Sequence, residues 1–257
     1  MCGIVGLLVK KPALKQQLGQ LMVPMLIGMT ERGPDSAGLA VFAEPLKGSA
    51  RKLSLYSGLT EAGADFDWHG LTHGLQEHLG VASKIDIKHN HAVLSFEVAP
   101  DIVKKWLREH YPLLHILSTG QTIDLYKDIG TPSMVADRYD FSALTGSHLV
   151  GHTRMATESA VTPDRAHPFT AGEDFCLVHN GSLSNPYGLR RKLEPHGIHF
   201  DTDNDTEAAC RFLEWRLREG DDLETALHAG FEELDGFFTF LMGTPDKLSL
   251  IHISEPT

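Results

Sequence analysis

Short apolar runs of strand length recur along this chain between longer amphipathic segments, and this alternation restricts the folds open to it. Strands that alternate with paired helices bury their apolar faces best in a layered α/β domain. With 257 residues, of which 42% are apolar, the chain can bury one large core or two modest ones. The expected strands are residues 3–9, 39–42, 147–151, 175–178 and 237–242.

Three amphipathic segments are expected to form the helices that cover these strands. Apolar residues spaced by threes and fours run over residues 14–29, with Pro24 inside the pattern, so we expect this helix to kink or split. Two further helices are predicted at residues 209–217 and 223–234. The acidic residues within 203–207 favour a helix start there, because carboxylates stabilise the positive end of a helix.

Residues 43–120 are expected to form an insertion or small subdomain, because they are the least regular part of the sequence. Within them we predict a strand at residues 92–98 and a helix at residues 101–110. A histidine-rich stretch at residues 69–78 lacks the ligand arrangement of a zinc site. We therefore interpret it as a solvated face and expect no metal in this chain.

Charge and cysteine content argue against several classes of partner and compartment. The net charge is −11 and Lys and Arg form no cluster, which argues against nucleic acid or a membrane surface as the main partner. No apolar run approaches the roughly 20 residues that span a bilayer. The three cysteines, Cys2, Cys176 and Cys210, are widely spaced without a CxxC pair, so we expect a reducing, cytoplasmic compartment.

The end of the chain is expected to be foreign to the fold. Residues 248–257 resemble the translation of a transposase-type sequencing adapter. We therefore expect the domain to comprise residues 2–247, with a natural C-terminus that differs from this one. The alternative is a natural strand followed by a tail.

Cys2 is the first candidate for chemistry, since removal of Met1 would make it the N-terminal residue. A thiol and a free α-amino group would then lie on the same residue. The thiolate is the nucleophilic form of cysteine, and an α-amino group titrates at about 7.7–8.0, which suits proton transfer near neutral pH. One residue can thus supply both nucleophile and base. The alternative is that Cys2 is a small apolar residue at the start of a strand.

Five short segments point to one enzyme family. They are Cys-Gly-Ile-Val-Gly at 2–6, Arg-Gly-Pro-Asp-Ser-Ala-Gly at 32–38, Gly-His-Thr-Arg-Met-Ala-Thr at 151–157, His-Asn-Gly at 179–181 and Asn-Asp-Thr-Glu at 204–207. In this order they resemble the class II glutamine amidotransferases of the N-terminal-nucleophile hydrolase superfamily. The resemblance runs from residue 2 to about 240, outside most of the insertion. It implies an α/β (α+β) fold, the four-layer αββα sandwich, and hydrolysis of L-glutamine to glutamate and ammonia.

The resemblance implies catalytic roles for Cys2, Asn180 and Gly181. Attack of the cysteine on the substrate amide creates an oxyanion, which needs hydrogen-bond donors aimed at the developing charge. The side-chain amide of Asn180 and the backbone N–H of Gly181, just after an expected strand, would supply them. The alternative for Asn180 and Gly181 is an ordinary Asn-Gly turn.

The resemblance also implies substrate-binding roles for Arg154, Thr157 and Asp205. Arg154 can hold the α-carboxylate of glutamine with two parallel hydrogen bonds. Thr157 would add a hydroxyl, and Asp205 would neutralise the α-ammonium group. The alternatives are a surface ion pair for Arg154 and a helix-end carboxylate for Asp205.

Three further residues are expected to support the site. Arg32 would orient the N-terminal segment or order the active site. His152 and His179 border the site segments, and neither is needed as a base if the α-amino group serves, so we interpret them as core or supporting residues.

Two departures from the pattern bear on the subfamily. Met155 and Glu158 stand where relatives that make sugar phosphates often carry tryptophan and histidine. These residues resemble those of glutaminase subunits of glutamate synthase or N-methylglutamate synthase. That branch implies a separate synthase subunit as acceptor of the ammonia, with FMN and iron–sulfur clusters on partner chains and no cofactor in this one. No Rossmann or P-loop glycine pattern is present, so we expect neither dinucleotide nor ATP to bind.

Two alternative functions remain open at this point. One is an N-terminal-nucleophile amidase that acts on a different amide, although Arg154 and Asp205 match both charged ends of a free amino acid. The other is a non-catalytic regulatory subunit with the same fold, which the presence of Cys2, Asn180 and Gly181 argues against.

Overall fold

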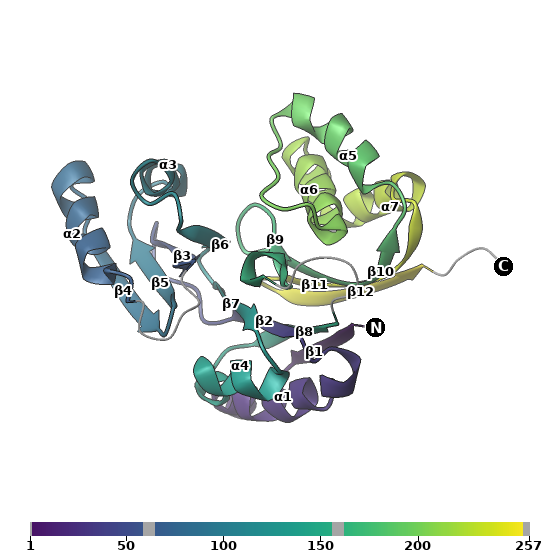
Figure 1. The fold of residues 1–257 in the computed structure, drawn as a ribbon, viewed down its shortest axis with the longest axis horizontal. Coiled ribbons are helices and arrows are strands. Elements are labelled where there is room, and N and C mark those ends of the chain that lie inside the picture. Colours follow the sequence, from purple (N-terminus) through teal and green to yellow (C-terminus); the bar gives the residue numbers. More distant parts are fainter. Residues whose placement is uncertain (1, 59–64, 156–161, 254–257) are drawn as a thin grey trace.

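Two antiparallel sheets face each other at the centre of the computed structural model, which describes residues 2–58, 65–155 and 162–253 (Figure 1). The first sheet has the strand order β1 (Gly3–Leu8), β8 (His148–Arg154), β2 (Ser36–Phe42), β7 (Ile123–Ile129). The second has the order β12 (Lys247–Ile253), β11 (Gly236–Thr244), β10 (Cys176–Leu183), β9 (Phe169–Thr170). Every neighbouring pair in the two sheets is antiparallel.

Helices cover the outer face of each central sheet. The helices α1 (Leu18–Ile27) and α4 (Pro132–Arg138) pack on the first sheet, whereas α5 (Pro186–Leu193), α6 (Asp205–Arg218) and α7 (Leu223–Glu233) pack on the second (Figure 1). This is the expected four-layer αββα sandwich, and the fold class is confirmed. The 3-10 helices are Pro12–Gln17, Thr30–Arg32, Phe141–Ala143, Pro163–Arg165 and Glu194–His196. In the part of the chain that the structure describes, no helix combines the length and the apolarity that crossing a membrane requires.

An apolar layer between the two sheets holds the sandwich together. Phe42 and Val150 of the first sheet pack there with Cys176, Val178 and Leu241 of the second. Each sheet presents one apolar face inward because successive side chains of a strand point to opposite sides. The two faces bury each other, which fixes the position of one sheet relative to the other.

A third sheet lies to one side of the sandwich, in the region expected to be the least regular. Its strand order is β4 (Ser83–Lys88), β5 (His91–Phe96), β3 (Arg51–Tyr56), β6 (His115–Gly120), and α2 (Trp68–Leu79) and α3 (Pro100–His110) pack on it (Figure 1). The strand predicted at residues 92–98 and the helix predicted at residues 101–110 correspond to β5 and α3, whereas α2 and the other three strands were not predicted. The strand β4 has the sequence Ser-Lys-Ile-Asp-Ile-Lys and is largely exposed, so it offers too few apolar residues for a search based on apolar runs.

The N-terminal helix and the second strand differ from expectation in detail. The helix α1 continues through Pro24 instead of splitting there. The missing N–H of Pro24 deprives only the Gln20 carbonyl of a donor, and Gln20 lies on the exposed side of the helix, where water can replace that donor. The strand β2 begins at Ser36, so residues 36–38 lengthen the strand that was expected at residues 39–42. The two flanking strands β8 and β7 extend it by pairing with these residues.

Part of the C-terminal segment that was expected to be foreign joins the second sheet. Residues 247–253 form β12, which pairs with β11 from Thr244 opposite Lys247 to Phe238 opposite Ile253. Alternating apolar and polar residues pair with a sheet edge whatever their origin.

Candidate active site

The N-terminal strand brings Cys2 to the end of the first sheet. In the antiparallel pair of β1 and β8, Gly3 lies opposite Thr153, so Cys2 continues the register to the level of Arg154. Cys2 is half-buried, and Arg154 is only 6% exposed. The low exposure of Arg154 excludes the alternative of a surface ion pair. The pairing thus brings together two of the predicted site residues, from the first and the third of the five segments.

The segment that contains Arg32 wraps around this corner of the sheet. Arg32 Nε donates a hydrogen bond of 3.3 Å to the backbone oxygen of Cys2. Gly33 approaches the backbone so closely that a Cβ atom there would lie 2.4 Å from the carbonyl carbon of Thr153. The Asp35 N–H donates to the Arg154 carbonyl at 3.0 Å. Arg32 therefore contacts the N-terminal segment, in agreement with its expected orienting role.

Asn180 and Gly181 lie inside β10, in the second sheet, and not just after a strand as expected. They pair with Thr239 and Phe238 of β11. Gly181 has a φ of 143°, which residues other than glycine rarely adopt. A Cβ atom at this position would lie 2.2 Å from the Phe237 oxygen. Glycine at this position allows the close pairing of β10 and β11. The Asn-Gly turn is excluded because the strand continues to Leu183.

Asp205 is the first residue of α6 and also contacts β10. One of its carboxylate oxygens, Oδ2, accepts a hydrogen bond of 3.1 Å from the Leu183 N–H, and the other, Oδ1, lies 3.7 Å from His179 Nδ1. Burial opposes ionisation of Asp205, but the neighbouring His179 and the N–H groups of Leu183 and Thr206 outweigh it and lower its pKa. The residue is thus a helix-end carboxylate, as the alternative proposed, and it remains charged at neutral pH beside the strand of Asn180.

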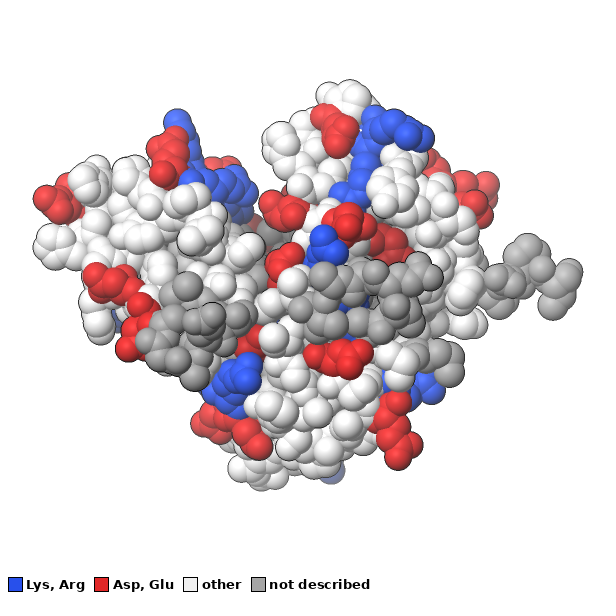
Figure 2. All heavy atoms as spheres, in the orientation of Figure 1, with Lys and Arg blue, Asp and Glu red and all other residues white. Residues whose placement is uncertain are grey.

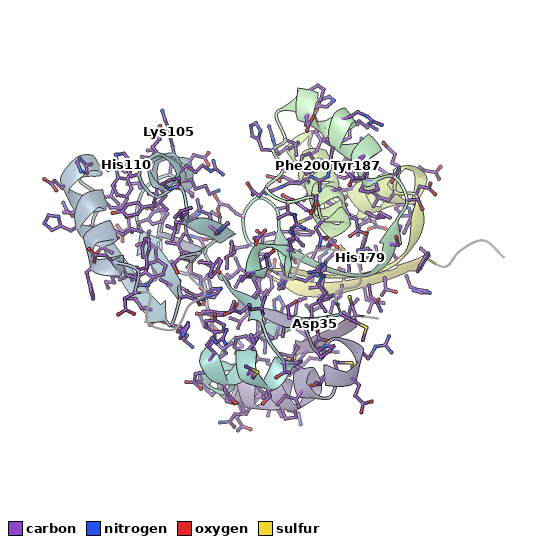
Figure 3. All side chains as sticks on the ribbon, in the orientation of Figure 1. Asp35, Lys105, His110, His179, Tyr187 and Phe200 are labelled. Carbon is purple, nitrogen blue, oxygen red and sulfur yellow. The ribbon has the colours of Figure 1, made fainter. Side chains whose placement is uncertain are left out.

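A hydrogen bond between two histidines joins the two sheets at the site. His152 Nε2 on β8 donates to the backbone oxygen of His179 on β10 at 3.0 Å. Both side chains are buried, as expected for core residues. Burial lowers the pKa of His152 to about 3, and the charge of Arg154 adds to this effect. His152 is therefore neutral at physiological pH, with its proton on Nε2. Figure 3 labels His179 on β10 and Asp35 directly ahead of β2.

A third buried histidine, His167, was not singled out from the sequence. Its ring lies 4.0 Å from that of His152 between centroids, and its Nε2 lies 2.7 Å from Thr206 Oγ1. It lies in the segment Ala-His-Pro at 166–168, which carries no recognised motif. Only the folded contacts with His152 and Thr206 connect it with the site.

Among the nine residues predicted for the site, Thr157 lies outside the residues that the structure describes, as does Glu158. The remaining eight form two groups. On or beside the first sheet lie Cys2, directly ahead of β1, Arg32 in the short helix Thr30–Arg32, and His152 and Arg154 in β8. On the second sheet and at the start of α6 lie His179, Asn180, Gly181 and Asp205.

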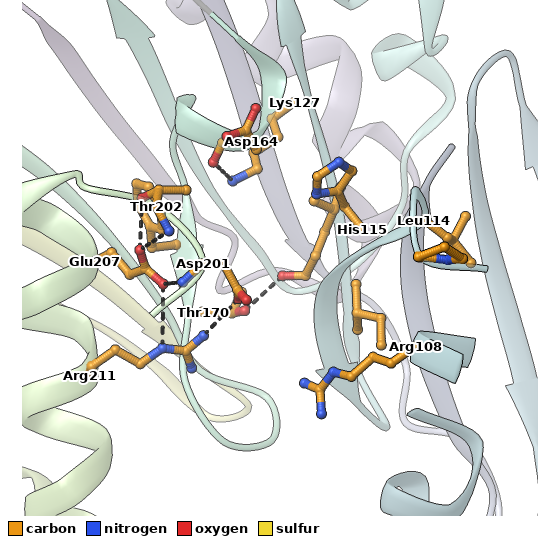
Figure 4. A pocket seen from close by; sticks show the side chains of 14 residues that line it. Arg108, Leu114, His115, Lys127, Asp164, Thr170, Asp201, Thr202, Glu207 and Arg211 are labelled. Carbon is orange, nitrogen blue, oxygen red and sulfur yellow. Dashed lines mark hydrogen bonds and ion pairs between the residues drawn. The ribbon is translucent and has the colours of Figure 1, made fainter. Parts of the chain in front are cut away.

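A separate cavity of about 390 Å³ lies between α3 and β6 on one side and the start of α6 on the other. Figure 2 shows it as a notch between two lobes of the molecular surface, and Figure 4 shows its lining. Arg211 forms ion pairs there with Asp201 at 3.4 Å and Glu207 at 3.7 Å. The described residues that line this cavity include none of the predicted site residues.

Lys127 forms the inner wall of this cavity and holds the segment that carries His167. Its Nζ donates to the backbone oxygens of Asp164, Ala166 and Pro168 at 3.1, 2.8 and 3.3 Å. Burial lowers the pKa of this amine to about 8. The lysine thus fixes the residues on both sides of His167.

Comparison with known proteins identifies relatives along nearly the whole chain. A family model described as a glutamine amidotransferase domain matches residues 152–256. The glutamine amidotransferase-like protein GlxB of Rhizobium meliloti (strain 1021) is 46% identical over 252 residues, which cover 98% of this chain and 82% of that protein. A putative glutamine amidotransferase of Methanothermobacter thermautotrophicus is 28% identical over 268 residues, which cover 97% of this chain and 84% of that protein.

The fold is also found in a solved structure. The structure titled as that of the allosteric regulatory enzyme of purine biosynthesis aligns with a TM-score of 0.56 and 17% sequence identity. The alignment covers 98% of this chain but only 36% of the other. At this identity the likeness concerns the fold alone.

Proposed function

The chain belongs to the class II glutamine amidotransferases, and we propose that it hydrolyses L-glutamine to glutamate and ammonia with Cys2 as the nucleophile. The pairing of β1 with β8 is the observation that supports this most directly. It brings the N-terminal segment to the level of Arg154, at the corner where the His152–His179 hydrogen bond joins the two sheets. The nucleophile, the carboxylate-binding group and the strand of Asn180 thus belong to one site in this proposal.

The first half of the reaction forms a thioester. Removal of Met1 leaves Cys2 with a free α-amino group, which accepts the thiol proton as Sγ attacks the side-chain amide carbon of glutamine. The Asn180 side-chain amide and the Gly181 N–H donate hydrogen bonds to the resulting oxyanion. The carbon–nitrogen bond then breaks, and the α-ammonium group returns its proton to the leaving nitrogen, which departs as ammonia.

The second half of the reaction regenerates the enzyme. Water attacks the thioester carbon and the α-amino group accepts a proton from it. The carbon–sulfur bond breaks, glutamate leaves, and the proton returns to the thiol of Cys2. No other residue needs to act as a base, in keeping with the neutral, buried state of His152.

Both charged ends of the substrate find a partner in this site. In our proposal Arg154 binds the α-carboxylate, Thr157 contributes a hydroxyl, and Asp205 binds the α-ammonium group. The lowered pKa of Asp205 supports its role, because an ionised carboxylate is needed to bind a cation. We expect N-acylated glutamine to be a poor substrate, since it has no ammonium group for Asp205 to bind.

Glutamate release from L-glutamine tests the proposal. The wild type, with removal of Met1 verified by mass spectrometry, should release glutamate, whereas Cys2→Ala should release none. Cys176→Ala is the matched control, because Cys176 is buried between the sheets and burial raises the pKa of its thiol to about 12. Equal release by the wild type and Cys2→Ala, or none by a folded and processed wild type, would contradict the proposed chemistry.

We further propose that the ammonia passes to a separate synthase subunit in the cytoplasm. The match to GlxB supports this, because 82% of that protein aligns with this chain and little of it lies outside the match. FMN and iron–sulfur clusters would belong to the synthase and not to this chain. In the assembled complex, Cys2→Ala should abolish glutamine-dependent synthesis and leave synthesis from added ammonia intact; loss of both activities would contradict the division of labour.

A further inference from the structure

Thr206 lies where three buried or half-buried side chains of the site meet. Its Oγ1 is 2.7 Å from His167 Nε2 and 2.9 Å from His179 Nδ1. Asp205 Oδ1 is 3.4 Å from the same hydroxyl. A hydroxyl group has one proton to donate, so it cannot donate to all of these neighbours and must accept from at least one.

The carboxylate of Asp205 determines the direction of these hydrogen bonds. An ionised carboxylate only accepts, and Asp205 Oδ1 lies 3.7 Å from His179 Nδ1, so the proton of His179 is stabilised on Nδ1. That N–H faces the oxygens of Asp205 and Thr206. The Thr206 hydroxyl accepts from His179 and has two groups to which it can donate, Asp205 Oδ1 at 3.4 Å and His167 Nε2 at 2.7 Å. The nearer of the two is His167, which therefore receives the proton of the hydroxyl.

His167 is suited to accept this proton. Burial, together with the nearby His152, lowers the pKa of His167 well below its ordinary value, so the ring is neutral. A neutral imidazole has one acceptor nitrogen, which is Nε2 if the proton lies on Nδ1. The hydrogen bonds then form one chain, from His179 to Thr206 to His167.

The surrounding protein holds His167, the last member of this hydrogen-bonded series, in place. Lys127 Nζ binds the backbone oxygens of residues 164, 166 and 168, on both sides of His167. A Cβ atom on Gly38 would lie 2.0 Å from the His167 oxygen, so β2 packs directly against this residue. The imidazole of His167 is therefore held from the backbone and by contact with the tilted His152 ring, whose centroid lies 4.0 Å away.

We propose that Thr206 and His167 are positioning residues that orient His179 and, through it, the Asp205 carboxylate toward the α-ammonium group of the substrate. The inference rests on the proposed function, in which Asp205 binds that group. Neither Thr206 nor His167 touches glutamine in this arrangement. Both act by keeping the carboxylate of Asp205 in one orientation.

Substrate discrimination tests this role. Glutaramate is glutamine without its α-amino group, so it cannot use Asp205. Thr206→Val removes the hydroxyl while keeping the side-chain shape, and it should lower kcat/KM for glutamine about tenfold more than for glutaramate. Most of the loss for glutamine should appear as a higher KM, because the ammonium contact is made in the ground state as well as the transition state.

Thr206→Ser is the matched control, because it keeps the hydroxyl and should retain the preference of the wild type for glutamine over glutaramate. An equal loss on both substrates in Thr206→Val would show general damage and overturn the proposal. So would a Thr206→Ser variant that discriminates as poorly as Thr206→Val.

The protonation pattern tests the same chain of hydrogen bonds without turnover. Nitrogen-15 NMR of the histidines in Cys2→Ala, with assignment by His167→Gln and His179→Gln, should find the proton on Nδ1 in both His167 and His179. A proton on Nε2 of either ring would overturn the proposal. Lack of glutamate release by the wild type would remove the proposed function of Cys2, whereas this measurement would still decide the direction of the hydrogen bonds at Thr206.

Discussion

The buried amine of Lys127 should make the stability of the protein depend on pH in the alkaline range. Its Nζ donates to three backbone oxygens, lies 4.6 Å from the centre of the Phe169 ring, and has no carboxylate within ion-pair distance among the described residues. Carbonyl dipoles compensate only part of the loss of hydration. Burial therefore lowers the pKa of Lys127 from 10.5 to about 8.

The sign and size of the effect follow from this pKa. Between pH 8 and pH 10.5 the unfolded chain holds a proton that the folded protein has released. The contribution of Lys127 to the free energy of unfolding is therefore complete above the unfolded pKa and is lost as the pH falls through the folded pKa. Linkage gives an increase of about 2 kcal/mol in the free energy of unfolding between about pH 7 and pH 9.5.

Urea unfolding of Lys127→Met isolates this contribution. The difference in free energy of unfolding between the wild type and the variant should change by about 2 kcal/mol between those two pH values, in favour of the wild type at the higher pH. Lys105→Met, at a side chain that is 78% exposed, controls for the loss of one positive charge. A difference between wild type and Lys127→Met that stays constant with pH would refute the reasoning.

Three further predictions concern the site and the core. Gly181→Ala places a Cβ atom 2.2 Å from the Phe237 oxygen at a φ of 143°, so we expect at least about a tenfold loss of kcat in the glutamate assay; an unchanged kcat would contradict the role of this strand. Phe42→Ala should lower the free energy of unfolding by about 3–5 kcal/mol in urea, because Phe42 is fully buried between the sheets; a loss below about 1 kcal/mol would show that the packing there is not limiting. Burial lowers the pKa of His91 to about 3 from its ordinary value of 6.5. Between these two pH values the unfolded state binds a proton that the folded state does not, so the free energy of unfolding decreases as the pH is lowered. His91→Gln should reduce that slope by about 1.4 kcal/mol per pH unit near pH 5, and equal slopes for the wild type and the variant would count against a neutral buried His91.

Much of the sandwich was predictable because its strands are continuous apolar runs. Residues 3–9 and 175–178 were expected to be strands and lie in β1 and β10. The side sheet was missed where its strands are polar, as in β4. The start of β2 was missed because Ser36 and Gly38 have the composition of a loop, and only pairing with both neighbours makes them a strand.

The candidate residues of the site were likewise chosen from short sequence signals. The motifs point to Cys2, Arg154 and Asp205, because the proposed glutamine chemistry needs those side chains whatever surrounds them. The motifs do not indicate conformation. Asn180 and Gly181 have the sequence of a turn, yet they lie in a strand because β11 supplies hydrogen-bond partners along the whole of β10.

The sequence by itself determined the class of enzyme and the layered fold, and it supplied the candidates for the groups that carry the proposed chemistry. Tertiary structure alone decided which distant residues support them. His167 and Thr206 are 39 positions apart and meet at 2.7 Å, and Lys127 reaches the backbone on both sides of His167 from another strand. Such contacts depend on strand register and on how the helices pack against the sheets. Local sequence patterns report the face that a residue occupies but not the partner that it meets there.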